Sequence, residues 1–217
     1  MINRRWAKGM ITGGAMAGQQ HQDEDLRHVD WYARQISGER FVGCDLREAD
    51  LEEVSTTGCV FEECDLSGVR LNASTHSETA FLRCKFRRTS LFGATLRGCK
   101  LTGSVFEDGA ALRPLTVEGG DWSYVSLRYL DLSGLDLTAV RLRDADLTGA
   151  TLTDAVLRDA DLGNARLDDA ALGGADLRGA SLAGVDMRRL QLAGVRLDVT
   201  QAAQLAMAYG AEVDWQP

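Results

Sequence analysis

The chain has 217 residues, of which 45% are hydrophobic, and this is enough to build the core of a single globular domain. Its formal net charge of −8 argues against direct binding to nucleic acid, which requires a basic surface. No segment is long and apolar enough to suggest a membrane span. Only two prolines occur, as expected for a fold built on continuous backbone ladders.

Residues 1–22 are rich in Gly, Ala, Gln and Met and carry no repeat. This composition predicts a disordered leader, or sequence that lies upstream of the native start or remains from cloning. An export signal is the functional alternative, because Arg4 and Arg5 precede a short apolar segment. Glycines interrupt that segment, so the pattern does not favour export.

Between residues 23 and 198 a large apolar side chain returns at most fifth positions, and we call this position the centre of each repeat. The series runs without a slip from Leu127 to Leu197. A small or branched apolar residue stands two positions before each centre, often with Asp in between. The repeating unit therefore reads Ala-Asp-Leu-x-x.

A period of five excludes the two common secondary structures as the repeating unit. On an α-helix five residues advance about 500°, which scatters successive leucines around the cylinder. On a flat strand an odd spacing places successive leucines on opposite faces. What remains is a short extended piece followed by a two-residue corner, with four corners closing a coil of about 20 residues and coils stacking about 4.8 Å apart. The sequence therefore predicts an all-β solenoid.

The amino-terminal half follows the same period less regularly, with its centres from Leu26 to Phe106 in one register. From Leu112 onward the register is displaced by one residue, which places an insertion beside Gly109 and just before Pro114. We expect a bulged corner or kink at this register break, near residues 107–114. Together the repeats predict about nine coils and a rod of about 40 Å.

All five cysteines fall two residues before a centre, on the inward small-residue position: Cys44, Cys59, Cys64, Cys84 and Cys99. We expect small buried hydrophobes in a reducing cytoplasm, because an odd count and the lack of paired CxxC spacing disfavour a disulfide framework or a metal site. His76 occupies a centre one coil after Thr56, among serines and threonines. A hydrogen-bonded buried histidine or a local outward bulge is favoured over a ligand or catalytic histidine. No catalytic residue, metal or cofactor is expected.

After Leu197 the repeat gives way to a helical pattern that starts with Thr200 as a capping residue and ends at Gly210. We predict that residues 199–217 form a short capping helix and a tail. The helix carries more apolar surface than closure of the solenoid needs, which predicts a homodimer through this end. The candidate dimerisation residues are Ala203, Leu205, Met207, Tyr209 and Trp215. The alternative is that they only plug the last coil.

The repeated Ala-Asp-Leu-x-x unit resembles the pentapeptide-repeat family, whose fold is a right-handed quadrilateral β-helix. Segments that the repeat does not dictate, at residues 61–69, 74–76, 81–89, 103–106 and 112–116, also resemble the MfpA and Qnr group of that family. This likeness runs from about residue 41 to 205. The leader, the inserted residue and the tail from residue 212 depart from it.

The resemblance implies a function. Members of that group form dimers through their carboxyl ends, mimic DNA, bind the type II topoisomerase DNA gyrase and protect it from fluoroquinolones or related gyrase poisons. We therefore expect a cytoplasmic, non-enzymatic protein of this kind. The alternative is a pentapeptide-repeat scaffold that binds another protein partner. An enzyme is disfavoured, since β-helical acyltransferases have six-residue repeats and no histidine here has a plausible catalytic partner.

Outward carboxylates toward the predicted dimer centre are the candidates for contact with gyrase. We expect its basic groove to attract Glu118, Asp121, Asp131, Asp136, Asp144 and Asp146. We expect the acidic cluster from Glu48 to Glu63 to contribute less to this attraction. The alternative for all of these residues is an ordinary solvated surface that keeps the rod soluble.

Overall fold

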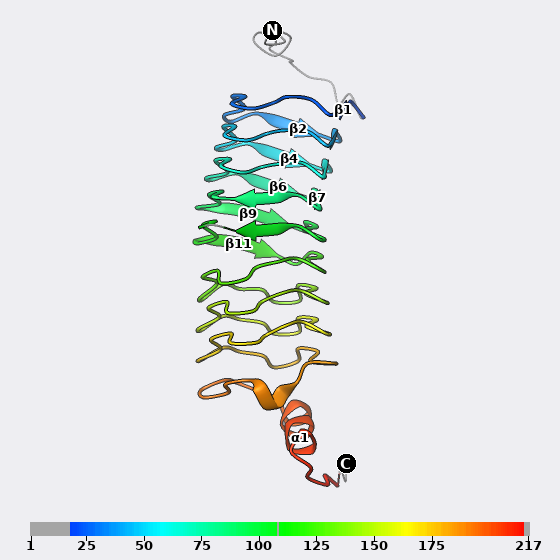
Figure 1. The fold of residues 1–217 in the computed structure, drawn as a ribbon, viewed down its shortest axis with the longest axis vertical. Coiled ribbons are helices and arrows are strands. Elements are labelled where there is room, and N and C mark those ends of the chain that lie inside the picture. Colours follow the sequence, from blue (N-terminus) through cyan, green and yellow to red (C-terminus); the bar gives the residue numbers. More distant parts are fainter. Residues whose placement is uncertain (1–17, 108, 215–217) are drawn as a thin grey trace.

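The computed structural model describes residues 18–107 and 109–214, which form a rod of stacked coils (Figure 1). The coils follow one another in chain order, from the blue end at β1 to the red end at α1. This confirms the all-β solenoid that the five-residue period predicts, in the form of the right-handed quadrilateral β-helix that the resemblance implies. The short helix at the carboxyl end is also confirmed.

In the amino-terminal half the coils pair through short parallel strands that form two sheets and one strand pair. The first sheet contains β1 (Gln20–Gln22), β3 (Arg40–Val42), β5 (Val60–Glu62) and β7 (Ala80–Leu82). The second contains β2 (Gln35–Ser37), β4 (Ser55–Thr57), β6 (Thr75–Ser77), β9 (Ala94–Arg97) and β11 (Leu115–Glu118). The pair consists of β8 (Lys85–Arg87) and β10 (Val105–Glu107). Phe41 lies beside Phe61, which confirms the coil length of 20 residues.

Between β11 and residue 198, a stretch described throughout, no strand forms and the coils pair through single residues such as Asp131 with Thr151. Aspartates precede many of these centres, and the carboxylate of each accepts a hydrogen bond from the backbone N–H two residues later. Asp131 accepts such a bond from Ser133 at 3.0 Å. None of the described strands contains Asp. The repeated aspartate therefore holds the chain in a local turn at the start of a corner.

The core consists of the inward side chains of successive coils, which stack along the rod. In the amino-terminal half Phe61 lies between Phe41 and Phe81, with ring centroids 4.7 and 5.0 Å away. Phe86 and Phe106 stack at 4.4 Å. In the carboxyl-terminal half leucines hold most of the centres and alanines hold the inward position two residues earlier, and these side chains are buried. Most predicted inward positions are therefore buried in both halves. The exceptions near the carboxyl end are the centres Leu192 and Leu197, which are only half-buried, and the outward Asp176, which is buried.

The five cysteines are buried and free, as predicted. Their thiols donate to backbone carbonyl oxygens of the preceding coil, as Cys64 does to Phe41 at 3.5 Å and Cys84 does to Phe61 at 3.3 Å. Burial raises the pKa of the Cys99 thiol to about 11. The Cys99 thiol is therefore protonated at neutral pH. All five cysteines serve as small core side chains.

One coil has an extra residue, at the register break. Ser90 pairs with Ala111 and Val105 with Ser126, 21 residues apart, whereas Ser126 and Asp146 are again 20 apart. The corner that follows β10 absorbs the insertion. The peptide bond between Arg113 and Pro114, just after it, is cis. The ladders on both sides of this coil remain in line.

Many corners have a residue with positive φ, and the side chain there lies over the same corner of the next coil. Asp154 covers Gly174, and a Cβ atom on that glycine would come 2.2 Å from the Asp154 Oδ1. Asp159 covers Gly179 in the same way, at 2.1 Å. Glycine at these positions therefore provides both the left-handed backbone conformation and the space for the preceding corner.

The carboxyl end of the solenoid is closed by a 3₁₀ turn, η2 (Met187–Arg189), and by α1 (Val199–Ala208). The helix is capped by Asp198, which forms a capping box with Gln201, so our assignment of Thr200 as the capping residue was wrong. The Gln201 amide donates to the carbonyl oxygens of Leu177 and Ala180, at 2.6 and 2.8 Å. This polar contact satisfies backbone groups that the end of a β-helix leaves unpaired.

At the amino-terminal end β1 begins at Gln20, so the coils start before residue 23, where we placed their beginning. His21 occupies the centre position five residues before Leu26, which the leader assignment concealed. Residues 1–17 of the predicted leader lie outside the described part of the chain. In the part that is described, no helix is long and apolar enough to cross a membrane.

Candidate partner-binding surface

The structure distributes the six candidate acidic residues around the rod. Four of them occupy bridge positions in four separate ladders, in which Asp121 pairs with Arg141, Ser126 with Asp146, Asp131 with Thr151, and Asp136 with Val156. These ladders run along the four faces of the coil. Glu118 ends β11, and Asp144 lies on a corner with a φ of 55°. The candidates therefore do not form one continuous patch.

Four of the six candidates are paired with arginines. The closest contacts are Asp131 with Arg113 at 2.9 Å, Asp146 with Arg128 at 2.9 Å, Glu118 with Arg97 at 3.0 Å and Asp121 with Arg141 at 3.3 Å. Asp146 also lies 3.4 Å from Arg166. Each pair replaces a single negative charge by a nearly neutral dipole, so these carboxylates attract a distant cation less than their number suggests.

Local hydrogen bonds keep these aspartates ionised. Hydrogen bonds from the hydroxyl and the N–H of Ser133, with a further contribution from Arg113, lower the pKa of Asp131. For Asp146, partial burial opposes ionisation, but hydrogen bonds from Thr148 and Arg128 outweigh it and lower the pKa. The aspartates on the faces therefore have a structural role in the corners besides any role in binding.

Asp136 and Asp144 differ from the other candidates. Within the described residues neither forms an ion pair, and Asp136 only accepts a hydrogen bond from the Thr138 N–H at 2.9 Å. Both carboxylates therefore present a full negative charge to solvent. The sequence did not distinguish them from the arginine-paired residues, because the pairs join side chains 18 to 21 positions apart.

In the carboxyl-terminal half, three further carboxylates share the corner position of Asp144 and were missed by our sequence reasoning. The corner carboxylates are Asp144, Asp154, Asp159 and Asp169, with φ values of 55 to 58°. None of them has an ion pair in the part of the chain that the structure describes. Because a coil has 20 residues, positions 144, 154, 159 and 169 fall on its four different corners. Their signal in the sequence is an acidic residue two positions after a centre.

Two tyrosines occupy the same kind of corner near the middle of the rod. Tyr124 is 63% exposed and Tyr129 is 70% exposed. The Arg128 guanidinium lies 5.2 Å from the centroid of the Tyr129 ring and also donates to its hydroxyl at 3.2 Å. Tyrosine and arginine are common in the centres of protein interfaces. The sequence analysis did not identify these residues.

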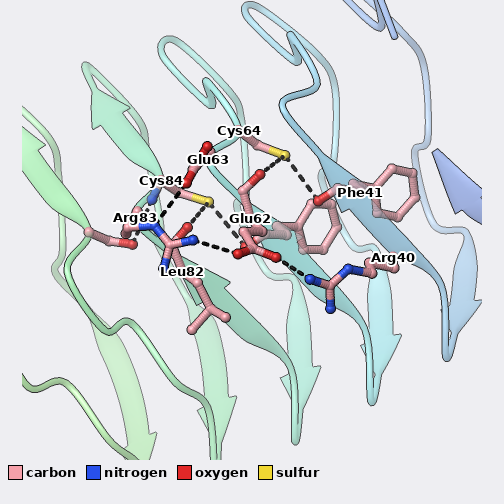
Figure 2. Close-up of polar contacts among 10 residues, drawn as sticks. Arg40, Phe41, Glu62, Glu63, Cys64, Leu82, Arg83 and Cys84 are labelled. Atoms are coloured by element: carbon pink, nitrogen blue, oxygen red, sulfur yellow. Dashed lines mark hydrogen bonds and ion pairs between the residues drawn. The ribbon is translucent and has the colours of Figure 1, made fainter. Parts of the chain in front are cut away.

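The acidic cluster of the amino-terminal half is partly neutralised by arginines. Figure 2 shows Glu62 between two arginines, Arg40 and Arg83, which both bind its carboxylate. Arg83 reaches Glu63 as well, at 3.0 Å. We predicted a weaker contribution of this cluster to gyrase binding. That contribution would come from carboxylates such as Glu48, which forms no ion pair among the described residues.

The candidate dimerisation residues are divided between two sides of α1. Met207 is 50% exposed and Tyr209 is 68% exposed, whereas Leu205 is half-buried and packs against the core of the rod. A shallow pocket of about 320 Å³ is lined by Thr200, Ala203, Gln204, Met207 and Val213. Trp215 lies outside the described residues. The exposed side of the helix is thus apolar and accessible.

His76 is a satisfied core histidine. It is 1% exposed, with Nδ1 2.7 Å from the Thr56 hydroxyl and Nε2 3.0 Å from the Ser74 hydroxyl. Burial lowers its pKa to about 4, so the ring is neutral at physiological pH. The outward bulge that we left open does not occur. Among the described residues no group of three or more His, Cys, Asp or Glu side chains is arranged to hold a metal ion.

Comparison with solved structures identifies the same architecture in a resistance protein. A trypsin-treated variant of QnrB1, described as a plasmid-mediated fluoroquinolone resistance protein, matches with a TM-score of 0.83 and 25% identity, covering 92% of this chain and 100% of that chain. Full-length QnrB1 matches with a TM-score of 0.78 at 23% identity, covering 90% and 100%. The second match shows the fold alone.

Among curated proteins, the chain is 45% identical over 87 residues to the pentapeptide repeat protein MfpA of Mycobacterium tuberculosis, covering 40% of this chain and 47% of that protein. It is 46% identical over 54 residues to MfpA of Mycolicibacterium smegmatis, covering 25% and 28%. These matches span less than half of the length of either relative.

The family models match both halves of the rod. A model described as "Pentapeptide repeat region" matches residues 35–108, and one described as "Pentapeptide repeats (8 copies)" matches residues 123–159 and 160–198. These ranges coincide with the coils on either side of the register break. The chain therefore belongs to the pentapeptide-repeat proteins.

Proposed function

We propose that this protein binds DNA gyrase in the cytoplasm as a mimic of duplex DNA, and that it protects the enzyme from antibiotics such as fluoroquinolones or modulates its activity. The observation that carries the proposal is a rigid rod with outward carboxylates, whose fold matches QnrB1 along 92% of the chain. The partial identity to MfpA supports it.

The dimensions of the rod are compatible with a DNA-binding groove. Coils spaced about 4.8 Å apart give a rod of about 40 Å, so two rods joined end to end span about 80 Å. At about 3.4 Å per base pair this corresponds to roughly 24 base pairs of duplex. The basic surface that normally receives such a duplex would meet carboxylates along the rod.

The homodimer in this proposal forms through the carboxyl ends. Met207 and Tyr209 are exposed, and with the shallow pocket beside Met207 they supply an apolar surface, although the Tyr209 hydroxyl donates to the Arg188 carbonyl oxygen. Removal of residues 199–217 should abolish the dimer, which light scattering on the intact and shortened chains would measure. A monomeric intact protein at micromolar concentration would contradict this part of the proposal.

We assign the attraction to gyrase mainly to the unpaired carboxylates. In the part of the chain that the structure describes, no arginine pairs with Asp136 or the corner carboxylates, whereas Asp121, Asp131 and Asp146 each pair with one. A partner must compete with the arginine for the paired residues. The unpaired set therefore refines the six residues proposed from the sequence.

The test is a competition between this protein and duplex DNA for gyrase at two salt concentrations. Because mimicry depends on charge complementarity, binding should weaken steeply with salt and DNA should displace the protein. The triple variant Asp136→Asn, Asp144→Asn, Asp159→Asn should bind more weakly than a matched control, Asp121→Asn, Asp131→Asn, Asp146→Asn. Asparagine tolerates the corner conformation and retains an oxygen that accepts the local N–H bonds.

Function is measured in parallel by gyrase supercoiling and DNA cleavage with and without a fluoroquinolone. We expect the native protein to reduce drug-induced cleavage, and the first triple variant to do so less than the control. Salt-independent binding, or simultaneous binding of DNA and this protein in one groove, would refute mimicry. If mimicry is refuted, the extensive pairing of face carboxylates with arginines favours the alternative, in which the rod is a scaffold for another protein partner.

A further inference from the structure

A groove of about 440 Å³ follows one corner and one face of the rod near the middle of the chain, and we call it the corner groove. One side is formed by positions that carry almost no side chain, which are Gly98, Gly120 and Ala139. The other side is a ladder with one outward residue from each of four successive coils, which are Lys100, Asp121, Arg141 and Asp161. Asp159, one of the corner carboxylates, completes the lining at the carboxyl-terminal end.

The corner groove is hollow because its corner lacks the large side chains found on other corners, such as Tyr124. Gly120 stands at an inward position that holds Cys99 in the coil before and Val140 in the coil after. Its φ is 119°, and a Cβ atom on it would come 2.3 Å from the Cys99 carbonyl oxygen. Only glycine fits there, so the hollow is a fixed feature of this corner.

The charges of the corner groove are paired in the middle and free toward the two ends. Asp121 pairs with Arg141 at 3.3 Å. Lys100 and Asp159 are both exposed, and within the described residues neither forms an ion pair. The groove therefore presents a free positive charge toward its amino-terminal end and a free negative charge toward its carboxyl-terminal end.

The spacing of these two charges matches an extended peptide. Lys100 and Asp159 belong to coils three steps apart, which is about 14 Å at about 4.8 Å per coil. Four residues of extended chain cover about the same distance, and side chains four residues apart project to the same side. Asp161, which lies 3.5 Å from Arg143, adds a carboxylate next to Asp159 in the lining. The carboxylates would repel a phosphate backbone, so the groove fits a peptide and not a nucleic acid.

We propose that the corner groove binds an extended segment of the protein partner, with an acidic side chain at Lys100 and a basic side chain at Asp159, four residues apart in that segment. The inference rests on the proposed function for the identity of the partner, gyrase. Opposite charges at the two ends define the direction in which the segment lies, which a uniformly acidic surface does not do.

Two synthetic peptides with blocked ends test the groove without gyrase, namely Arg-Gly-Gly-Gly-Glu and Arg-Gly-Gly-Gly-Gln. When the first is added to the isotope-labelled intact protein, the NMR signals of the Gly98 and Gly120 amides should shift and reach saturation. The second should bind about threefold more weakly, because it cannot form an ion pair with Lys100. Equal affinities, or shifts that do not saturate, overturn the proposal.

Ala139→Tyr fills the corner groove with a side chain that other corners of the rod accept. Ala139 has a φ of 57°, and Tyr124 has 60° on its own corner. The matched control is Ala73→Tyr, which places the same ring on a corner with a φ of 53° outside the groove. We expect the peptide shifts to disappear in Ala139→Tyr and to persist in Ala73→Tyr. Equally tight binding to both variants would contradict a site in the groove.

A charge variant provides a second test that leaves the core untouched. Lys100→Gln should bind the two peptides equally, whereas Lys85→Gln, which changes an exposed lysine on β8, should keep the preference for the glutamate peptide. A preference that survives in Lys100→Gln means that the acidic side chain does not bind at Lys100, and the proposal falls.

Gyrase binding to the same variants shows whether the partner uses the groove. If gyrase binds the native protein, Ala139→Tyr should weaken that binding by about tenfold or more relative to Ala73→Tyr. Equal binding of the two variants overturns this inference and leaves the proposed function standing. If gyrase does not bind the native protein, the proposed function fails, and the peptide titrations alone decide whether the groove is a peptide site.

Discussion

The two halves of the rod follow the same path with different side chains. In the amino-terminal half, aromatic centres stack, and the coils pair on some faces through strands of three or four residues without Asp and on others through single residues such as Asp45. In the carboxyl-terminal half, leucine and alanine fill the core and the coils pair through single residues, many preceded by the local turn of an aspartate. The five-residue period therefore determines the winding, while the identity of the intervening residue determines the local backbone.

The largest expected effect tests the inward position of alanine in the carboxyl-terminal half. Ala160 is 1% exposed, and Ala160→Glu would bury a carboxylate without a partner among leucines. We expect a loss of about 4 kcal/mol in the free energy of unfolding, measured by urea denaturation. The control Asp159→Asn changes the adjacent outward corner and should lose less than about 0.5 kcal/mol. Equal losses would mean that the inward and outward positions are wrongly assigned.

An exchange of aromatic and aliphatic centres tests whether the two cores differ in width. Phe61→Leu should cost about 1–3 kcal/mol, because it removes two stacking contacts of about 0.5–1.5 kcal/mol each. Leu147→Phe should cost about 1–3 kcal/mol for the opposite reason, because a fully buried site between leucines has no space for a ring. Thermal melts of both variants measure these losses. A neutral Leu147→Phe would show that the two halves accept the same side chains.

Buried His76 in the amino-terminal half predicts a sensitivity to acid that a leucine at this position would lack. Burial lowers the pKa of His76 to about 4, from an ordinary value of about 6.5. The unfolded chain therefore binds a proton more readily between these values, and the contribution of a neutral His76 is complete above about pH 6.5 and lost as the pH falls toward 4.

We expect His76→Leu to lose less stability than the native chain between about pH 6.5 and 4, by at most about 3 kcal/mol. Urea denaturation across this range gives the comparison, and His28→Gln provides a histidine control. Parallel pH profiles for the native chain and His76→Leu would contradict the assignment of the buried neutral ring.

The smallest expected effect concerns the aspartate turn of the carboxyl-terminal half. Asp131→Ala removes the acceptor for the Ser133 N–H and should cost about 0.5–1 kcal/mol. Asp131→Asn retains an acceptor oxygen and should be nearly neutral. Thermal melts at moderate salt separate the two variants. Similar losses for both would assign the effect to the ion pair with Arg113 instead of the turn.

The fold was predictable because it depends on a period that repeats along most of the chain. An error at one position, such as the polar centre His76, is outweighed by its neighbours in the ladder. The ends were less predictable, because they have no repeat to correct them. At the amino-terminal end the register could have been extended by one repeat to His21, but a histidine does not resemble the leucine expected at a centre. At the carboxyl end Asp198 could have been chosen as the helix cap, but the pattern suggested Thr200.

The candidate binding residues were less predictable for a different reason. Whether a carboxylate is free depends on the side chain one coil away, and the choice among several arginines near Asp131 or Asp146 is decided by side-chain reach. The sequence shows that Arg113 and Arg128 lie within one coil of Asp131 and Asp146, respectively. It does not show that each arginine side chain turns toward its aspartate. The corner carboxylates could have been predicted from the sequence, because they always stand two positions after a centre of the five-residue repeat.

The coil of 21 residues shows where this rod can acquire new parts. Arg87 and Ser90 are separated by three steps along the chain, and their partners Glu107 and Ala111 by four, yet both pairs stay aligned. A longer insertion between Glu107 and Ala111 would likewise leave the phase of the two halves unchanged. This corner is therefore a point of modular growth, where evolution or an engineer can add a recognition loop at a fixed height on the rod without rebuilding either half.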